Sequence, residues 1–261
     1  MSQKNIAKSG NGKKKEVAII NSMFAEDAGV GLTNLGSDDL AMPMLKLLQK
    51  TSSELDELDD ARSGDIYNTV TKEAVKGKEG VCVINCAYSL QYIEWEPRGT
   101  GSGAPFNIYS AGDTIPATHR GIDDNKDYVV DGNGRYIERT AQHYLLVLNK
   151  EGMTQEALLA MKATQYKKSK GWNSAMKSVQ LKDSNGKLFI APRFSHTWNL
   201  TTAKEENKHG DWYGWIIEKD KILEDQNLYG KAKLFAESIK IGQVKVQHVR
   251  EDDSLDDEIP F

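Results

Sequence analysis

The sequence predicts a mainly β fold with a few helices, arranged as a Greek-key β-barrel. Short runs rich in β-branched and aromatic residues are separated by glycine-containing turns, which is the pattern of consecutive strands. One helical pattern lies between the first strands and the last pair, and another follows that pair. A length of 261 residues with 28% charged side chains suits a soluble protein with a substantial core.

The first elements follow from composition and periodicity. The polar, basic segment 1–16 is expected to be a flexible arm, and a short helix is expected around residues 18–28. Three apolar runs then predict strands at residues 42–49, 64–71 and 81–95. An acidic turn region separates the first strand from the second.

The middle of the chain combines an insertion with a predicted helix. Residues 97–140 are glycine-rich and predict an irregular insertion, which at this length is either functional or disordered. A strand is predicted at residues 142–150. Residues 153–179 predict a helix that is capped by Thr154 and interrupted near Gly171. One stripe of this helix consists of Leu158, Met161 and Gln165.

The last elements complete the barrel pattern. Two aromatic-rich runs, residues 188–202 and 211–219, predict a hairpin, and residues 228–242 predict a final helix. This order of strands, helix, two strands and helix matches an OB-like Greek-key barrel with an inserted helix. Such a barrel is partly open, and its groove and loops commonly bind oligonucleotides, although a fold alone does not establish a function.

The chain is expected to divide into three parts. The predicted parts are a basic arm and lead-in over residues 1–38, an OB-like domain over residues 39–245, and a disordered acidic tail over residues 246–261.

Charge is unevenly distributed. Residues 251–258 contain six acidic side chains and no basic one, so the net charge of −4 for the whole chain leaves +2 on residues 1–250. Residues 162–204 contain nine basic side chains against one acidic side chain, a net charge of +8. A basic region in the folded body and an anionic end predict two different partners.

The acidic tail ends in apolar residues. A solvated tail gains nothing from such an ending unless a partner receives it, and the ring and carboxylate of Phe261 suit an apolar pocket beside a basic residue. These last residues resemble the C-terminal tip of bacterial single-stranded DNA-binding protein. The resemblance implies that the tail recruits phage or host replication proteins such as a polymerase, a primase-helicase or a nuclease. The predicted partner-binding residues are Asp256, Asp257, Glu258, Ile259, Pro260 and Phe261.

The body resembles the larger single-stranded DNA-binding proteins of tailed phages, in which an OB fold precedes an acidic tail. The stretches that carry this resemblance are MPMLKLLQ with GDIYNTVT, AYSLQYIEWEPRG, MKATQYKKSKGWNS, and PRFSHTWNLTT with GDWYGWIIE. The resemblance implies a protein that coats single-stranded DNA without sequence specificity during phage DNA replication, recombination and repair, in the cytoplasm of an infected bacterium.

The residue chemistry points to the same ligand. Binding single strands without sequence preference needs cations for phosphates and aromatic faces for bases, and both are interleaved in this chain. Alternate aromatics of a strand must face the core, so core packing is the competing interpretation for each of them. The predicted DNA-binding residues are Tyr92, Trp95, Arg98, Lys162, Tyr166, Lys167, Lys168, Lys170, Trp172, Arg193 and Tyr213. Four arginines of the insertion could close over a strand or lie in a disordered loop: Arg98, Arg120, Arg135 and Arg139.

Enzymatic activity, metals and cofactors are not expected. The sequence has no phosphate-binding loop, no zinc-protease motif and no nucleophile elbow. Cys82 and Cys86 have no nearby histidine, so they are expected to be buried thiols rather than zinc ligands. No apolar run is long enough to span a membrane, and the N-terminus lacks a signal peptide.

Two other functions stay open. One is a recombination mediator or strand-annealing protein, in which promotion of duplex formation exceeds coating. The other is an interaction protein that inhibits a host enzyme and does not bind DNA. The sequence also leaves the oligomeric state open, a homodimer among the alternatives.

Overall fold

The computed structural model describes residues 20–32, 35, 39–97, 99–100, 103–122, 124–149, 152–207 and 210–242. The chain separates into two compact units, Met1–Leu40 and Ala41–Phe261. In the first unit, residues 20–26 form a helix, within the segment where the sequence predicts one. All further elements belong to the second unit, and the predicted tail, residues 246–261, lies outside the described residues.

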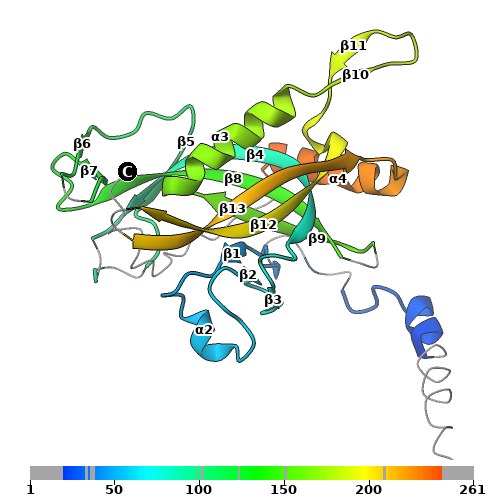
Figure 1. Cartoon of the computed structure of the whole chain (residues 1–261), viewed down its shortest axis with the longest axis horizontal. Coiled ribbons are helices and arrows are strands. Elements are labelled where there is room, and N and C mark those ends of the chain that lie inside the picture. The colour runs from blue at the N-terminus through cyan, green and yellow to red at the C-terminus, as the bar shows by residue number, and fades with distance from the viewer. Residues whose placement is uncertain are drawn as a thin grey trace, which may run out of the picture. The chain divides into compact units, whose positions relative to one another are not determined.

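Five long strands form a curled antiparallel sheet (Figure 1). β4 (Val81–Trp95), β8 (Tyr136–Leu148) and β9 (Thr154–Met161) follow one another as a meander. β12 (His196–Asn207) returns to pair with β4, and β13 (Gly210–Ile222) pairs with β12. The order β13-β12-β4-β8-β9 places the fourth strand beside the first, which is the Greek-key arrangement. The mainly β prediction with a curled, barrel-like sheet is therefore confirmed.

The far ends of β4 and β8 carry the insertion. β5 (Asn107–Ser110) pairs with β4, β7 (Asp127–Val129) pairs with β8, and β6 (Thr118–Arg120) pairs with β7. Residues 97–140 are therefore not wholly irregular, because three short strands extend the sheet there. β5 folds back on the preceding β4, and β6, β7 and the start of β8 pair with their sequence neighbours. Each of the three strands is only three or four residues long in a glycine-rich segment, so no alternating pattern marks it.

A small sheet lies between the two outer strands of the curled sheet. It consists of β1 (Leu45–Leu47), β2 (Ile66–Asn68) and β3 (Ala74–Val75), and the acidic turn region after β1 contains a one-turn helix, α2 (Glu54–Glu57). Met44, just before β1, forms a bridge with Leu158 of β9. The side chain of Gln49, just after β1, exchanges two hydrogen bonds with the backbone of Tyr213 in β13. The β1 segment thus partly closes the barrel between β9 and β13.

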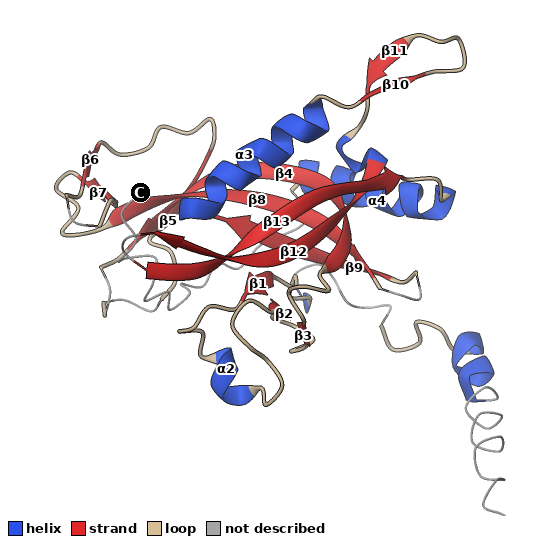
Figure 2. Cartoon of the chain, viewed as in Figure 1, coloured by secondary structure: helices blue, strands red, loops and turns tan. Residues whose placement is uncertain are grey.

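Two helices cover the sheet (Figure 2). α3 (Ala163–Lys177) contributes Trp172 and Met176 to an apolar cluster that also contains Leu145 of β8. α4 (Gln226–Lys240) contributes Ala232 and Phe235 to a second cluster, which contains Leu146 of β8. Because successive side chains of a strand point to opposite faces, these two clusters lie on opposite faces of the sheet. α4 begins where the Asp225 carboxylate accepts hydrogen bonds from the first backbone amides.

The predicted helix over residues 153–179 is wrong in its first part. Residues 154–161 form β9 and pair along their whole length with β8, so Thr154 caps no helix. Ala157, Leu158 and Leu159 are all buried, and a strand buried on both faces shows no alternation that separates it from a helix. α3 also runs through Gly171 without interruption, with open space where a Cβ would lie.

The predicted final hairpin and helix are confirmed as β12–β13 and α4. Residues 188–190 are not part of this hairpin. They form β11 (Leu188–Ile190), which pairs with β10 (Gln180–Lys182) in a separate hairpin after α3. A short 3₁₀ turn, η2 (Arg193–Ser195), leads into β12. Over the described ranges, no helix combines the length and the hydropathy that crossing a membrane requires.

Candidate nucleic-acid interface

Aromatic rings and cations lie in a row along the face of β4 and β8 that α3 covers, which we call the inner face. We call this row the aromatic–cation ladder. Its rings belong to Tyr88, Tyr92, Phe106, Tyr109 and Tyr166. Its cations belong to Arg135, Arg139, Lys170 and Arg193.

The sheet register sets the centre of the ladder. Tyr92 of β4 lies opposite Tyr109 of β5 on one side and opposite Arg139 of β8 on the other. Directly opposite residues share a face of the sheet, so these three side chains form one row across three strands. A bulge between Asn85 and Ala87 shifts the alternation of β4 upstream of this row.

α3 adds a second layer to the row. Tyr166 and Lys170 are four residues apart, which places them on one helix face, and the Lys170 Nζ lies 5.4 Å from the Tyr166 ring centre. The Arg139 guanidinium lies between two rings, 5.5 Å from the centre of Tyr92 and 5.4 Å from the centre of Tyr166. Arg139 and Lys170 are exposed and both tyrosines are half-buried, so the layer is open to solvent.

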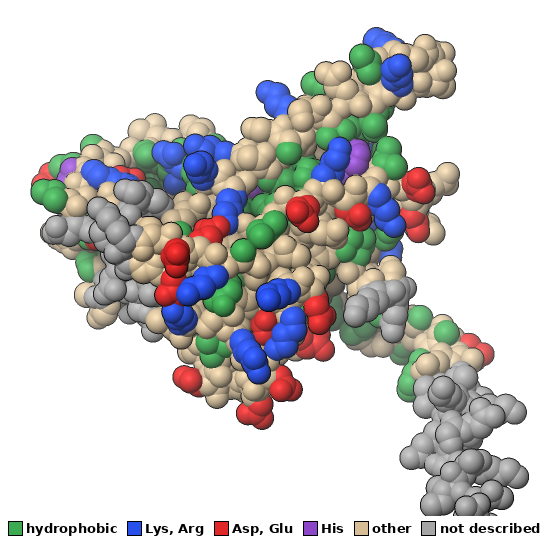
Figure 3. Space-filling model, in the orientation of Figure 1, with side chains coloured by type: hydrophobic (Ala, Val, Ile, Leu, Met, Phe, Trp, Pro, Cys, Tyr) green, Lys and Arg blue, Asp and Glu red, His purple; other side chains and the backbone are tan. Residues whose placement is uncertain are grey.

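The surface over this region is cationic. Figure 3 shows Lys and Arg side chains gathered near the start of α3, on the face in view. Lys167 and Lys170 of α3 are exposed, and so is Arg139 of β8. Phosphates could approach these cations without displacing core side chains.

Arg193 holds one end of the ladder. Its Nη1 donates hydrogen bonds to the Oδ1 atoms of Asn173 (2.9 Å) and Asn85 (3.3 Å), and its guanidinium lies 5.3 Å from the ring centre of Tyr88. Burial lowers the pKa of Arg193 and raises that of the Tyr88 phenol. Because an arginine side chain stays protonated in proteins, Arg193 supplies a fixed cation at this end of the ladder.

Behind Arg193 lies a buried polar chain that resembles a catalytic triad in its distances. His143 Nε2 lies 2.7 Å from Ser169 Oγ, and His143 Nδ1 lies 2.9 Å from Asn85 Nδ2. All three residues have no exposed surface. Arg193 donates to the Asn85 oxygen, so the Asn85 amide donates to Nδ1 and the imidazole proton is on Nε2, directed at Ser169. A general base would need Nε2 unprotonated, so the chain supports Arg193 and is not a nucleophilic site.

The buried histidine should make stability depend on pH. Burial lowers the pKa of His143 from 6.5 to about 3, so between these values the unfolded state binds a proton that the folded state does not. Above pH 6.5, His143 is neutral in both states and the free energy of unfolding does not depend on its titration. Below pH 6.5, the free energy of unfolding falls by about 1.4 kcal/mol per pH unit. Between pH 7 and pH 5 we expect H143Q to remove about 2 kcal/mol of the pH-dependent change in the free energy of unfolding, measured by urea denaturation.

The control for this prediction is H119Q, which removes an exposed histidine in β6. We expect its pH dependence to match that of the wild type. Equal pH dependence in H143Q and the wild type would show that His143 is not held neutral by burial.

Glu94 organises the other end of the ladder. This carboxylate is only 2% exposed, and it accepts hydrogen bonds from Arg135 Nε (2.7 Å) and from the Tyr109 hydroxyl (2.8 Å). The guanidinium of Arg135 lies 3.9 Å from the ring centre of Phe106, whose side chain is 51% exposed. Arg135 therefore neutralises the buried Glu94 carboxylate. Together with the Phe106 ring, it also presents a cation–π pair at the surface.

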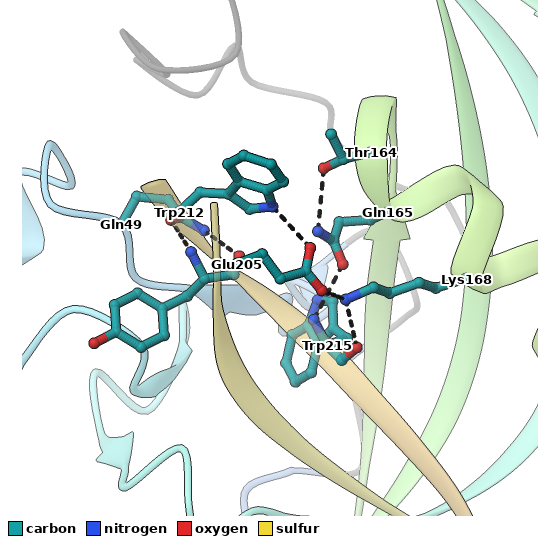
Figure 4. Close-up of polar contacts among 8 residues, drawn as sticks. Gln49, Thr164, Gln165, Lys168, Glu205, Trp212 and Trp215 are labelled. Atoms are coloured by element: carbon teal, nitrogen blue, oxygen red, sulfur yellow. Dashed lines mark hydrogen bonds and ion pairs between the residues drawn. The ribbon is translucent and has the colours of Figure 1, made fainter. Parts of the chain in front are cut away.

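Not all predicted DNA-binding lysines belong to the ladder. The Lys168 ammonium pairs with Glu205 and donates a hydrogen bond of 2.8 Å to the Trp215 carbonyl, so it joins α3 to β12 and β13 (Figure 4). Lys162 lies 3.6 Å from Glu138, at the start of α3. Lys168 therefore stabilises the packing of α3 on β12 and β13 instead of contacting DNA, because Glu205 already neutralises its charge.

The two tryptophans predicted to contact DNA are core residues. Trp95 is 5% exposed, and Trp172 is 3% exposed with its ring centre 4.7 Å from that of His143. Neither ring can receive a base without disrupting its packing. Tyr213 lies on β13 beside Gln49, away from the ladder, and Arg98 and the predicted tail residues lie outside the described residues.

The structure adds two residues that sequence reasoning missed, Phe106 and Tyr109. Neither follows a recognisable pattern, because their place is set by the pairing of residues 107–110 with residues 91–94. Of the two cysteines expected to be buried, Cys86 is buried, and burial raises the pKa of its thiol to about 12, whereas Cys82 is only partly buried. No group of three or more metal-binding side chains occurs in the ranges that the structure describes.

Comparison with known proteins gives a family. The model of the family described as "Pam3 phage gp34-like protein" matches residues 13–245. No match is found among curated proteins or among solved structures.

Proposed function

The chain belongs to the Pam3 phage gp34-like family, and from this membership and the ladder we propose that it binds single-stranded DNA without sequence specificity. The family match suggests a phage protein, and its description names no ligand. The argument for the ligand therefore comes from the residues of the inner face.

The ladder is the observation that carries the proposal. Nucleobases stack on aromatic faces regardless of sequence, and phosphates are held by cations. Tyr88 and Tyr92 are four residues apart on one strand face, a separation of about 13 Å at 3.3 Å per residue, so a bound strand would meet successive rings. No base-specific pattern of donors and acceptors is needed for such contacts.

The topology supports the same ligand. In OB-type barrels, oligonucleotides bind across the second and third strands and the loops after the first and fourth strands. Here β4, β8 and β9 are the first three strands, and the connection from β4 to β8 supplies Phe106, Tyr109 and Arg135. The ladder thus shares the second strand, through Arg139, and the connection after the first strand with that region. Tyr88 and Tyr92 lie on the neighbouring first strand, and no ladder residue lies on the third.

Arg139 suggests how a base would enter. It fills the space between the Tyr92 and Tyr166 rings, and a planar guanidinium stacks on rings much as a base does. We propose that a base takes this place and that Arg139 turns to the adjoining phosphate. The cation–π contacts would then be exchanged for base stacking and an ion pair.

The test is binding of fluorescently labelled oligo-dT, followed by anisotropy at two salt concentrations. We expect saturable binding, weaker binding of duplex DNA of equal length, and an affinity that falls with salt. Anisotropy is preferable to tryptophan quenching because Trp95, Trp172, Trp198 and Trp215 are buried. No binding of oligo-dT at low salt would favour the inhibitor alternative, and faster pairing of complementary strands would favour annealing.

The tail supports a second part of the proposal. Acids followed by Ile259, Pro260 and Phe261 form a peptide that an apolar, basic-rimmed pocket can bind. We propose that it recruits replication proteins to the coated strand. A fluorescent peptide of residues 251–261 should bind such a partner, and removal of Phe261 should abolish that binding.

A further inference from the structure

The β10–β11 hairpin exposes three consecutive large apolar side chains. It stands off the sheet beyond the end of α3 (Figures 1 and 2). Leu188, Phe189 and Ile190 are consecutive, and their exposed fractions are 56%, 42% and 61%. Leu188 and Ile190 lie on one face of the hairpin, and Phe189 lies on the other with Leu181.

Such a hairpin is not expected to remain uncovered. A lone two-stranded ribbon is marginally stable in water, and an apolar strand with a free edge tends to pair with another chain. Lys187 and Pro192 flank the apolar run, in the positions where natural sequences restrict uncontrolled pairing. These features favour a specific protein surface that covers the strand.

Within the described residues, β13 offers an open strand edge to which β11 could pair. The outward backbone groups of Tyr213 are occupied by Gln49, and those of Trp215 by Gln165 and Lys168 (Figure 4). The next residues with outward backbone groups are Ile217 and Lys219. Within the described ranges, no strand or side chain pairs with these groups, so this part of the β13 edge is open.

Charge and hydrophobicity match between the two elements. Beside the open edge, Ile216, Glu218 and Asp220 project from β13, and all three are exposed. The hairpin carries Lys182 and Lys187 beside its apolar residues. Lys182 shares a hairpin face with Leu188 and Ile190, and Lys187 shares the other face with Phe189. In either orientation an added β11 would therefore place an apolar side chain and one lysine on the face of Ile216 and the two carboxylates.

We propose that β11 of one copy pairs with the open β13 edge of a second copy of this chain. The two surfaces differ, so the contact is heterologous and each copy can bind two neighbours in an open row. This contact joins copies without DNA. If the chain binds single-stranded DNA as proposed above, the contact would also make coating of a long strand cooperative.

Charge reversal tests the contact on the full chain. Sedimentation velocity over a range of protein concentrations should show self-association in the wild type. Lys182→Glu with Lys187→Glu, and separately Glu218→Lys, should each weaken self-association by at least about tenfold, because like charges then meet. Mixing the two variants should restore it, since each hairpin again meets an edge of opposite charge.

The matched control is Lys233→Glu with Lys240→Glu, which makes the same charge change on the exposed face of α4. We expect wild-type self-association in this variant, and thermal unfolding of every variant shows whether it is folded. A wild type that is monomeric at all concentrations would overturn the proposal. Failure of the mixed variants to associate would also overturn it.

DNA binding separates this proposal from the function on which it partly rests. With an oligo-dT that holds one copy, the hairpin variant should bind as the wild type does, and with long poly-dT it should lose cooperativity. Equal loss on the short oligonucleotide would mean that the hairpin contacts DNA, which contradicts the proposal. Self-association without any binding of DNA would leave the contact intact and disprove the proposed function.

Discussion

Replacing Tyr92 and Tyr166 together with alanine should lower the affinity for oligo-dT by about 2–6 kcal/mol, since each stacked ring contributes about 1–3 kcal/mol. That is about thirtyfold at the lower bound and more than a thousandfold at the upper one. Both rings are half-buried at the open side of the ladder, with Arg139 between them. Each single variant should lose about half of this free energy.

The measurement is anisotropy of labelled oligo-dT at low and moderate salt. Stacking is not ionic, so the double variant should keep the salt dependence of the wild type while its affinity falls. The control is Tyr229→Ala, which removes a 45% exposed tyrosine on α4, outside the ladder. Wild-type affinity in the double variant would disprove the ladder as the DNA site.

Much of the fold follows from local pattern. The predicted strand 81–95 coincides with β4, because β-branched and aromatic residues fill it and glycine precedes it. The final helix was predictable from its apolar stripe and from Gly242 at its end. These elements carry their signals within their own residues.

Other elements depend on partners outside their own residues. The segment TQEALLAM consists mainly of helix-favouring residues, but it pairs with β8 and is covered on both faces, so tertiary packing overrides its intrinsic preference. The strands of the insertion are three or four residues long, and they pair with β4, with β8 and with each other. No periodicity within a window of the sequence contains this information.

The site shows the same division. The sequence predicted Tyr92, Tyr166, Lys170 and Arg193, because aromatics and cations are interleaved there, and the structure brings all four to the ladder. It could not separate exposed lysines from Lys168, whose partner Glu205 lies 37 positions away. Composition identifies the chemistry of the ligand, whereas the register decides which side chains can meet it.

Trp172 is the residue at which the local composition and the packing of the structure differ most. The sequence places it in a basic, aromatic stretch, which makes it a candidate for DNA contact with core packing as the competing interpretation. In the structure its ring packs between His143, at 4.7 Å between ring centres, and Trp198, at 5.8 Å, in the core beneath α3. Trp172→Ala should therefore lower the free energy of unfolding by about 3–5 kcal/mol, measured by urea denaturation, because it leaves a large cavity.

The variant Trp172→Leu separates packing from DNA contact. Leucine fills part of the cavity and has no aromatic face, so the free energy of unfolding should fall less than in Trp172→Ala. Affinity for oligo-dT, measured where the variant is fully folded, should stay within about twofold of the wild type, since a buried ring contributes no stacking to a base. A loss as large as that of the single Tyr92→Ala variant would mean that Trp172 leaves the core to meet DNA. The barrel would then have to open on binding, because Trp172 is only 3% exposed in the closed packing of α3.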